Sequence, residues 1–147
     1  MNCMNLRKNI IALSLPLCVL IIIVSCEGLL TPDFYSKETL NWQTQSIGQD
    51  MIDLFLMTPC LVITSILSCK KNKPAIMILG GVVLYLTYTF VIYCFDIHFN
   101  KLFIICCLAL GFSFYSILYF LFLQHREKNQ ENYRNKSVTR FVAIYPL

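Results

Sequence analysis

The sequence predicts an all-α integral membrane protein, built as a bundle of four transmembrane helices. Of its 147 residues, 57% are hydrophobic and only 14% are charged, and the mean hydropathy is +0.64. Soluble domains usually carry about 25% charged residues. The apolar residues also gather in four long blocks, without the polar faces that would cover a soluble core. The basic residues lie between these blocks, as they do in membrane proteins.

The net charge of +4 does not indicate nucleic-acid binding. A nucleic-acid-binding surface gathers basic residues into a stripe with interleaved aromatic side chains, and the sequence contains no such stripe. We therefore expect the lipid bilayer, and not a nucleic acid, to be the partner of this chain. The sequence leaves open whether a membrane partner subunit or a second copy of the chain also binds.

The first span is expected at residues 9–30. Its apolar core runs from Ile10 to Ser25, and the next residues extend it toward the about 20 that a membrane helix needs. A basic segment, an apolar stretch and then Cys26 also resemble a lipoprotein signal, in which Cys26 would carry the lipid. Pro16 is compatible with both interpretations.

A polar stretch, 27–49, follows the first span. Residues 31–33, Thr-Pro-Asp, are typical of a turn. Thr39 is placed to cap a short helix, and the rings of Tyr35 and Trp42 suit the headgroup zone of a membrane. We therefore expect this stretch to lie at the membrane surface.

The other three spans are expected near residues 50–69, 75–95 and 101–123. Pro59 lies in the middle of the second span, where a membrane helix tolerates it. A compact basic loop, 70–74, separates the second span from the third. The third and fourth spans are long enough to cross about 30 Å of hydrocarbon at about 1.5 Å per residue.

The distribution of Lys and Arg predicts the orientation of these spans. Only Lys37 and Lys101 lie on one side of the predicted bundle. Ten basic residues lie on the other side: Arg7, Lys8, Lys70, Lys71, Lys73, Arg126, Lys128, Arg134, Lys136 and Arg140. Because basic residues collect on the cytoplasmic side, we expect a cell-membrane protein whose N-terminus and C-terminus are both cytoplasmic.

Polar residues near the predicted outer surface form a candidate polar pathway. They are Gln49, Asp50, Asp53, Tyr88, Tyr93, Asp96, His98 and Asn100. Asp53 is the most informative, because an acid at the centre of a membrane helix costs about 2.5–3.5 kcal/mol and is functional by default. Gln49 shares its helix face at a spacing of four residues. The alternative is that both acids meet interfacial water at the positive end of the helix dipole.

The pair Asp96 and His98 has a second interpretation. With the acids of the second span it would form a carboxylate–imidazole cluster for a proton or a metal ion, whereas an Asp-x-His pair is more often a solvated turn. No catalytic triad order, phosphate-binding glycine loop or zinc motif occurs. We therefore predict no catalytic, cofactor-binding or metal-binding residues, and no cofactor.

Tyrosines and cysteines recur in the predicted spans. Tyr85, Tyr115 and Tyr119 share helix faces with small residues, which indicates either helix packing or a polar pathway lined by hydroxyls. The eight cysteines show no CxxC pair and no zinc-type spacing. We expect them to pack as small apolar side chains, with a disulfide between Cys26 and Cys94 as the alternative.

Four segments of the chain stand out: 28–35 (GLLTPDFY), 48–50 (GQD), 85–90 (YLTYTF) and 98–103 (HFNKLF). With these segments the chain resembles a family of uncharacterised small prokaryotic multi-pass membrane proteins that has no assigned activity. The resemblance runs from about residue 28 to residue 123. It implies the four-span topology and an uncleaved first span. It also implies a shared polar feature containing Gln49, Asp50, Tyr88 and Asn100.

The sequence therefore predicts a transmembrane domain at residues 1–124 and a cytoplasmic basic tail at 125–147. The tail ends in seven apolar residues, 141–147, too few to span a bilayer. They are interpreted either as the start of a missing fifth span or as a segment lying on the membrane surface. For the function we expect a small transporter or channel-like subunit. The alternatives are a non-catalytic scaffold or accessory subunit and, with the least support, a membrane-embedded enzyme.

Overall fold

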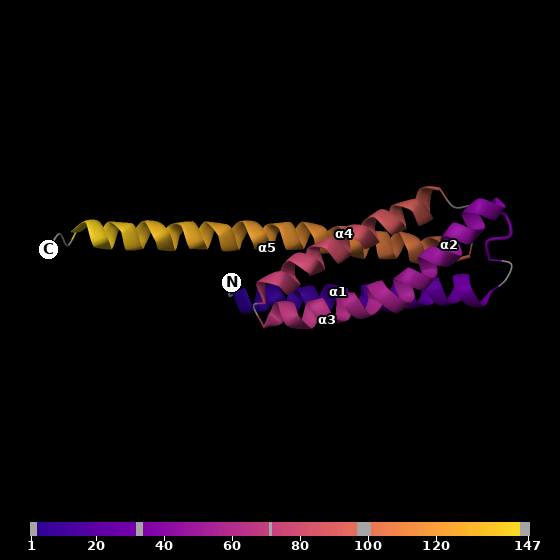
Figure 1. Ribbon diagram of the computed structural model, residues 1–147, viewed down its shortest axis with the longest axis horizontal. Coiled ribbons are helices and arrows are strands. Elements are labelled where there is room, and N and C mark those ends of the chain that lie inside the picture. The colour runs from indigo at the N-terminus through magenta and orange to yellow at the C-terminus, as the bar shows by residue number, and fades with distance from the viewer. Residues whose placement is uncertain (1–2, 32–33, 71, 97–100, 145–147) are drawn as a thin grey trace.

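The computed structural model describes residues 3–31, 34–70, 72–96 and 101–144, and within these ranges it describes the side chains of Asn9 and of the residues from Ile11 to Arg126. All regular structure in these ranges is helical. Four helices are long and apolar enough to cross a membrane, and they lie side by side in one elongated bundle (Figure 1). The predicted fold class, an all-α membrane bundle of four spans, is confirmed.

The first helix, α1, covers Cys3–Leu30 and remains one helix through Pro16. Its membrane-spanning part is Ile11–Leu30, close to the expected 9–30. Cys26 lies inside this helix with a half-buried side chain. The helix therefore continues past the position at which a lipoprotein signal would end.

The second span is longer than expected and is made of three consecutive pieces. These are α2 (Leu40–Ile52), a short π-helix η1 (Asp53–Met57) and α3 (Thr58–Cys69). The expected start at residue 50 was wrong, because the hydropathy marks where the chain becomes apolar and not where the helix begins. Thr39 occupies the expected N-cap position, although its side chain makes no capping bond.

The π-helix has a local cause in Pro59, which has no N–H and whose ring crowds the carbonyl four residues earlier. The helical turn before Pro59 contains one extra residue, so that the Thr58 N–H donates to the carbonyl of Asp53, five residues earlier. The Thr58 hydroxyl donates to the same carbonyl oxygen at 2.8 Å. Such single π turns occur often at functional sites, and this one contains the buried Asp53.

The last two helices are α4 (Lys73–Phe95) and α5 (Phe103–Ile144). Asn72 caps α4 by accepting a bond from the Ala75 N–H. The membrane-spanning part of α5 is Phe103–Arg126, and the helix then continues without a break into the basic tail. Figure 1 shows this extension projecting beyond the bundle.

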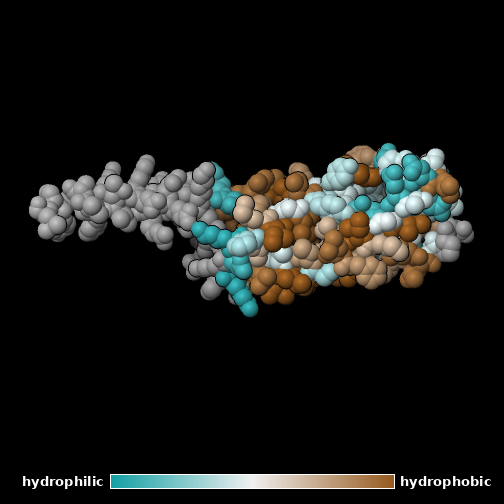
Figure 2. Space-filling model, in the orientation of Figure 1, coloured by the Kyte–Doolittle hydropathy of each residue, from teal (hydrophilic) through white to brown (hydrophobic). Residues whose placement is uncertain are grey.

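The four spans pack in the cyclic order α1, α5, α4 and α3, so that each has two neighbours. The chain enters and leaves the bundle at the same end (Figure 1). We call this end the proximal end, and the end with the α1–α2 and α4–α5 connections the distal end. Figure 2 shows a mostly apolar band between hydrophilic residues near the two ends. Large apolar side chains of the spans, such as Phe55 and Leu84, are exposed in the protein alone and suit contact with lipid.

Candidate functional site

The distal end of the bundle contains a buried aspartate held by two tyrosines. The Asp50 side chain is fully buried. The Tyr35 hydroxyl donates to one of its carboxylate oxygens and the Tyr93 hydroxyl to the other, each at 2.7 Å. The two hydroxyl oxygens lie 3.5 Å apart. This arrangement, which we call the carboxylate clasp, joins the α1–α2 connection, α2 and α4.

Gly28 gives the clasp its space on the α1 side. A Cβ atom at this position would overlap the Asp50 carboxylate and would lie 2.9 Å from the Tyr35 hydroxyl. Since only glycine lacks a Cβ atom, α1 can approach the carboxylate closely here. The clasp therefore involves three of the helices and not only the two that carry its hydrogen bonds.

Tyr35 lies outside the membrane-spanning helices and yet is almost fully buried, with 2% of its side chain exposed. Its ring packs edge-on against Phe34, with the ring centroids 4.9 Å apart. Burial, reinforced by the nearby Asp50 carboxylate, raises the pKa of the Tyr35 hydroxyl well above its ordinary value. The hydroxyl therefore stays protonated and can act as a permanent donor to Asp50.

A second buried carboxyl group, that of Asp53, lies one helical turn after Asp50 in the second span and is 2% exposed. The Gln49 amide donates to Asp53 Oδ1 at 3.5 Å, and the Tyr85 hydroxyl also bonds this carboxylate. The same amide nitrogen donates to the Tyr85 hydroxyl and, at 3.1 Å, to the Thr89 hydroxyl. Asp53 is thus connected to a short chain of groups that can exchange hydrogen bonds along α4.

The electrostatics of the two carboxyl groups have a consequence for their charge. Among the described residues, the groups that act on them are tyrosine hydroxyls, one amide and the other carboxyl, and none is a cation. An isolated ionised carboxylate is very unfavourable in a low-dielectric interior, so it takes up a proton or a cation. This arrangement can therefore bind and release a proton, or hold a small cation.

The structure brings together four of the predicted site residues: Gln49, Asp50, Asp53 and Tyr93. The interfacial alternative for the two acids was wrong. The helix begins ten residues before Asp50, so that both side chains are buried in the bundle and neither lies at the positive end of a dipole.

Two other predicted site residues lie away from the carboxyl groups. The Tyr88 side chain is 65% exposed, because a step of five residues along the helix rotates it by about 140° from Tyr93. Asp96 follows the last residue of α4 and is exposed. Tyr88 and Asp96 are therefore not among the residues that the structure gathers around the two carboxyl groups. His98 and Asn100 lie outside the described residues.

Sequence reasoning missed three members of the site, Gly28, Tyr35 and Thr89, and named Tyr85 only in the alternative of a pathway lined by hydroxyls. One signal was present, since Tyr85, Thr89 and Tyr93 recur every four residues and so share one face of α4. The roles of Gly28 and Tyr35 had no such signal. Their contacts with Asp50 depend on how α1 and the connection fold back onto α2.

The cysteines follow the expected packing role in part. Cys18 and Cys106 are buried among apolar side chains. The alternative of a disulfide between Cys26 and Cys94 was wrong, since both thiols are free. Cys94 lies instead near Cys107 of α5, with the two sulfur atoms 3.8 Å apart.

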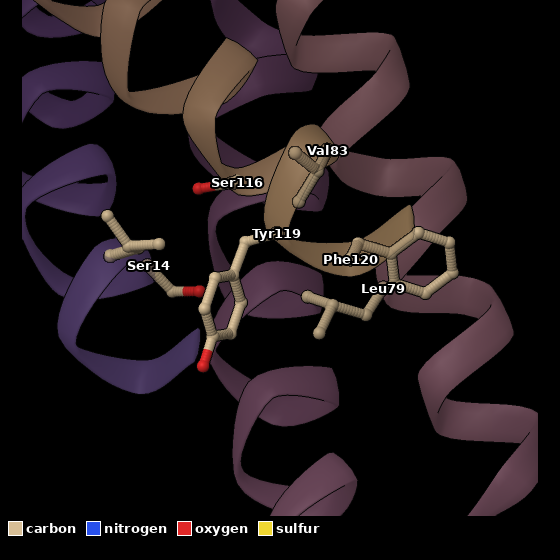
Figure 3. A pocket seen from close by; sticks show the side chains of 7 residues that line it. Ser14, Leu79, Val83, Ser116, Tyr119 and Phe120 are labelled. Carbon is tan, nitrogen blue, oxygen red and sulfur yellow. The ribbon is translucent and has the colours of Figure 1, made fainter. Parts of the chain in front are cut away.

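A small pocket lies in the proximal half, between α1, α4 and α5. Its free volume of about 10 Å³ is about enough for one water molecule. Figure 3 shows Ser14 and Tyr119 on one side of the pocket and Leu79 and Phe120 on the other. The pocket is too small for an organic substrate.

No protein-family model, curated protein or solved structure matches this chain. The resemblance of segments 28–35, 48–50, 85–90 and 98–103 to a multi-pass family therefore stays a prediction. In the described part of the chain, no cluster of three or more His, Cys, Asp and Glu side chains could hold a metal ion. The two carboxyl groups and their hydroxyl and amide partners are the candidate site.

Proposed function

We propose that this protein is a small transporter or channel-like subunit of the cell membrane, in which Asp53 takes up and releases a proton. One observation carries the proposal. Two carboxyl groups, of Asp50 and Asp53, are buried inside one membrane span, and their partners are neutral hydroxyl and amide groups. Ionisable residues inside membrane spans mark ion pathways and proton relays, and their high energetic cost makes a purely accidental placement implausible.

The two carboxyl groups have different roles in this proposal. Asp50 accepts strong bonds from two tyrosine hydroxyls and is fixed by Gly28 on the α1 side. Asp53 bonds an amide and a hydroxyl, and these partners also bond one another. A hydroxyl can donate or accept, so the Tyr85–Thr89 side of Asp53 can adjust to either protonation state. Asp53 is therefore the exchanging group and Asp50 the fixed one.

A proton-flux assay tests this proposal. The purified full chain is reconstituted in liposomes with a pH-sensitive dye inside, and a potassium gradient with valinomycin drives proton entry. We expect a rate above that of empty liposomes and a loss of about tenfold or more in Asp53→Asn. Asp96→Asn is the control, because this carboxyl is exposed at the end of α4. A wild-type rate equal to that of empty liposomes would contradict the proposal.

The orientation is part of the same proposal. We infer that both chain termini are cytoplasmic, because the sequence distributes ten basic residues to one side of the predicted spans and two to the other. Single cysteines at Lys37 and Asn72, introduced into a chain without other cysteines, test this in intact cells. The cysteine at position 37 should react with an impermeant maleimide, and the cysteine at position 72 should not. Labelling at position 72 alone would mean that the orientation is the reverse.

A second function, that of a non-catalytic scaffold, is favoured by the carboxylate clasp itself. The hydrogen bonds of Asp50 join three segments of the chain and would stabilise the bundle without moving an ion. Infrared spectroscopy separates the two functions through the carboxyl C=O band. A proton route requires the band of a protonated Asp53 to shift within minutes in D₂O. A band that is lost in Asp53→Asn but is insensitive to D₂O supports the scaffold.

A further inference from the structure

Two thiols from neighbouring helices lie in contact near the distal end. Cys94 is the penultimate residue of α4 and Cys107 is the fifth residue of α5. Their sulfur atoms are 3.8 Å apart. Cys107 is exposed and Cys94 is half-buried, and both lie near the distal ends of their helices. Neither thiol takes part in the carboxyl chemistry proposed above.

We propose that Cys94 and Cys107 form a redox-reactive dithiol, which closes to a disulfide by exchange with an oxidised thiol compound and fixes the end of α4 to α5. The proposal goes beyond the proposed function and does not rest on it. The class of reaction partner is a disulfide, either of a small molecule or of an oxidoreductase.

The geometry favours bond formation between these two sulfur atoms. A disulfide bond is about 2.05 Å long, so the sulfur atoms have to approach by about 1.8 Å, a movement that rotation about the Cα–Cβ bonds can supply. α4 and α5 pack directly against each other. The neighbouring Cys106 is 3% exposed and belongs to the core. It is therefore turned away from the reagent that reaches Cys107.

The exchange balances in two steps. The thiolate of Cys107 attacks one sulfur of the oxidant, forming a mixed disulfide and releasing one thiolate of the oxidant. The thiolate of Cys94 then attacks the Cys107 sulfur and releases the second thiolate. The dithiol loses two electrons and two protons, and the disulfide bond of the oxidant is reduced to two thiols.

Closure would act on the carboxylate clasp through the chain. Cys94 directly follows Tyr93, whose hydroxyl bonds Asp50. On the other helix, Cys107 follows Cys106, which lies within electrostatic range of the Asp50 carboxylate. A disulfide would tie the backbone that carries Tyr93 to α5. The oxidised protein should therefore unfold at a higher temperature than the reduced protein.

Tryptic mapping of the full chain in lipid nanodiscs tests the proposal. The protein is treated with oxidised glutathione, blocked with N-ethylmaleimide and digested with trypsin. Trypsin cuts after Lys101 and Arg126 but not before Pro74, so fragment 72–101 contains Cys94 alone and fragment 102–126 contains Cys106 and Cys107. Mass spectrometry should detect these two fragments joined by a disulfide and separated by reductant.

Single substitutions assign the bond and guard against a folding artefact. The linked fragments should persist in Cys106→Ser and disappear in Cys94→Ser and Cys107→Ser. Oxidation should raise the unfolding temperature of the wild type and of Cys106→Ser, and should leave that of Cys94→Ser unchanged. Absence of the linked fragments in the oxidised wild type would overturn the proposal. So would their persistence in Cys107→Ser, because the bond would then involve Cys106.

Discussion

The distal and proximal halves of the same bundle are joined by different kinds of contact. In the distal half, Asp50 and Asp53 are buried with tyrosine hydroxyls and an amide around them. In the proximal half, a buried hydrogen bond of 2.9 Å joins the hydroxyls of Ser65 in α3 and Ser14 in α1. There the helices approach through small residues, such as Gly80 beneath the Phe120 ring.

This difference indicates which half carries a function. In lipid, apolar burial does not favour protein over lipid, so small residues and hydroxyl bonds are sufficient to associate helices. The proximal half shows that this chain can pack in that way. The carboxyl groups of the distal half are therefore not needed for packing alone, and their desolvation opposes folding. This difference supports the proposal that Asp53 exchanges a proton.

The largest effect on this comparison is expected from Asp50→Ala. The change removes the acceptor of two buried tyrosine hydroxyls, and each orphaned donor costs about 1–3 kcal/mol. Because the hydroxyls of Tyr35 and Tyr93 lie 3.5 Å apart, they can partly satisfy each other. We expect a loss of about 2–4 kcal/mol in the free energy of unfolding, measured by titration with SDS and circular dichroism.

Asp50→Asn is the matched variant, because an amide keeps one acceptor and the shape of the side chain. It should lose less stability than Asp50→Ala. Equal losses in the two variants would mean that packing volume, and not hydrogen bonding to the tyrosines, accounts for the role of Asp50.

Gly28→Ala should be next in magnitude. The added methyl group overlaps the Asp50 carboxylate, and overpacking of a core typically costs about 1–3 kcal/mol. Gly81→Ala is the control, since a Cβ atom there meets nothing within 4 Å and alanine favours the helix by about 0.8–1 kcal/mol. Thermal unfolding in nanodiscs should show a lower transition for Gly28→Ala only. A similar response of both variants would refute the close approach of α1 to Asp50.

These contacts also mark the limit of prediction from the sequence. Length and hydropathy were enough to predict four spans, and the spacing of Gln49 and Asp53 correctly predicted a shared helix face. The sequence does not indicate how a uniformly apolar helix is rotated about its axis. For this reason the predicted pathway contained Tyr88, whereas in the structure Tyr85 bonds the Asp53 carboxyl group. Tyr35 was likewise assigned to the headgroup zone, although it is buried against Asp50.

Gly80→Ala sharpens the comparison from the proximal half. A Cβ atom at this position would lie 2.5 Å from the Phe120 ring. The contacted atoms are at the far end of a side chain that can shift toward the neighbouring pocket, so the clash is softer than that at Gly28. We expect a loss of about 1 kcal/mol. If Gly80→Ala lowered the free energy of unfolding more than Gly28→Ala does, the helices would be more tightly packed in the proximal half than in the distal half.

The smallest effect is expected from Ser65→Ala. This change removes the 2.9 Å bond to Ser14 between α3 and α1, and hydrogen bonds between membrane helices contribute about 0.6 kcal/mol on average. The double-mutant cycle with Ser14→Ala isolates that value, because both side chains are buried and neither is charged. SDS titration of the two single variants and the double variant should give a coupling of about 0.6 kcal/mol or less.

A coupling as large as the loss in Asp50→Ala would mean that the serine pair is as important to assembly as the carboxylate clasp. The inference that the distal carboxyl groups have a role beyond packing would then lose its main support.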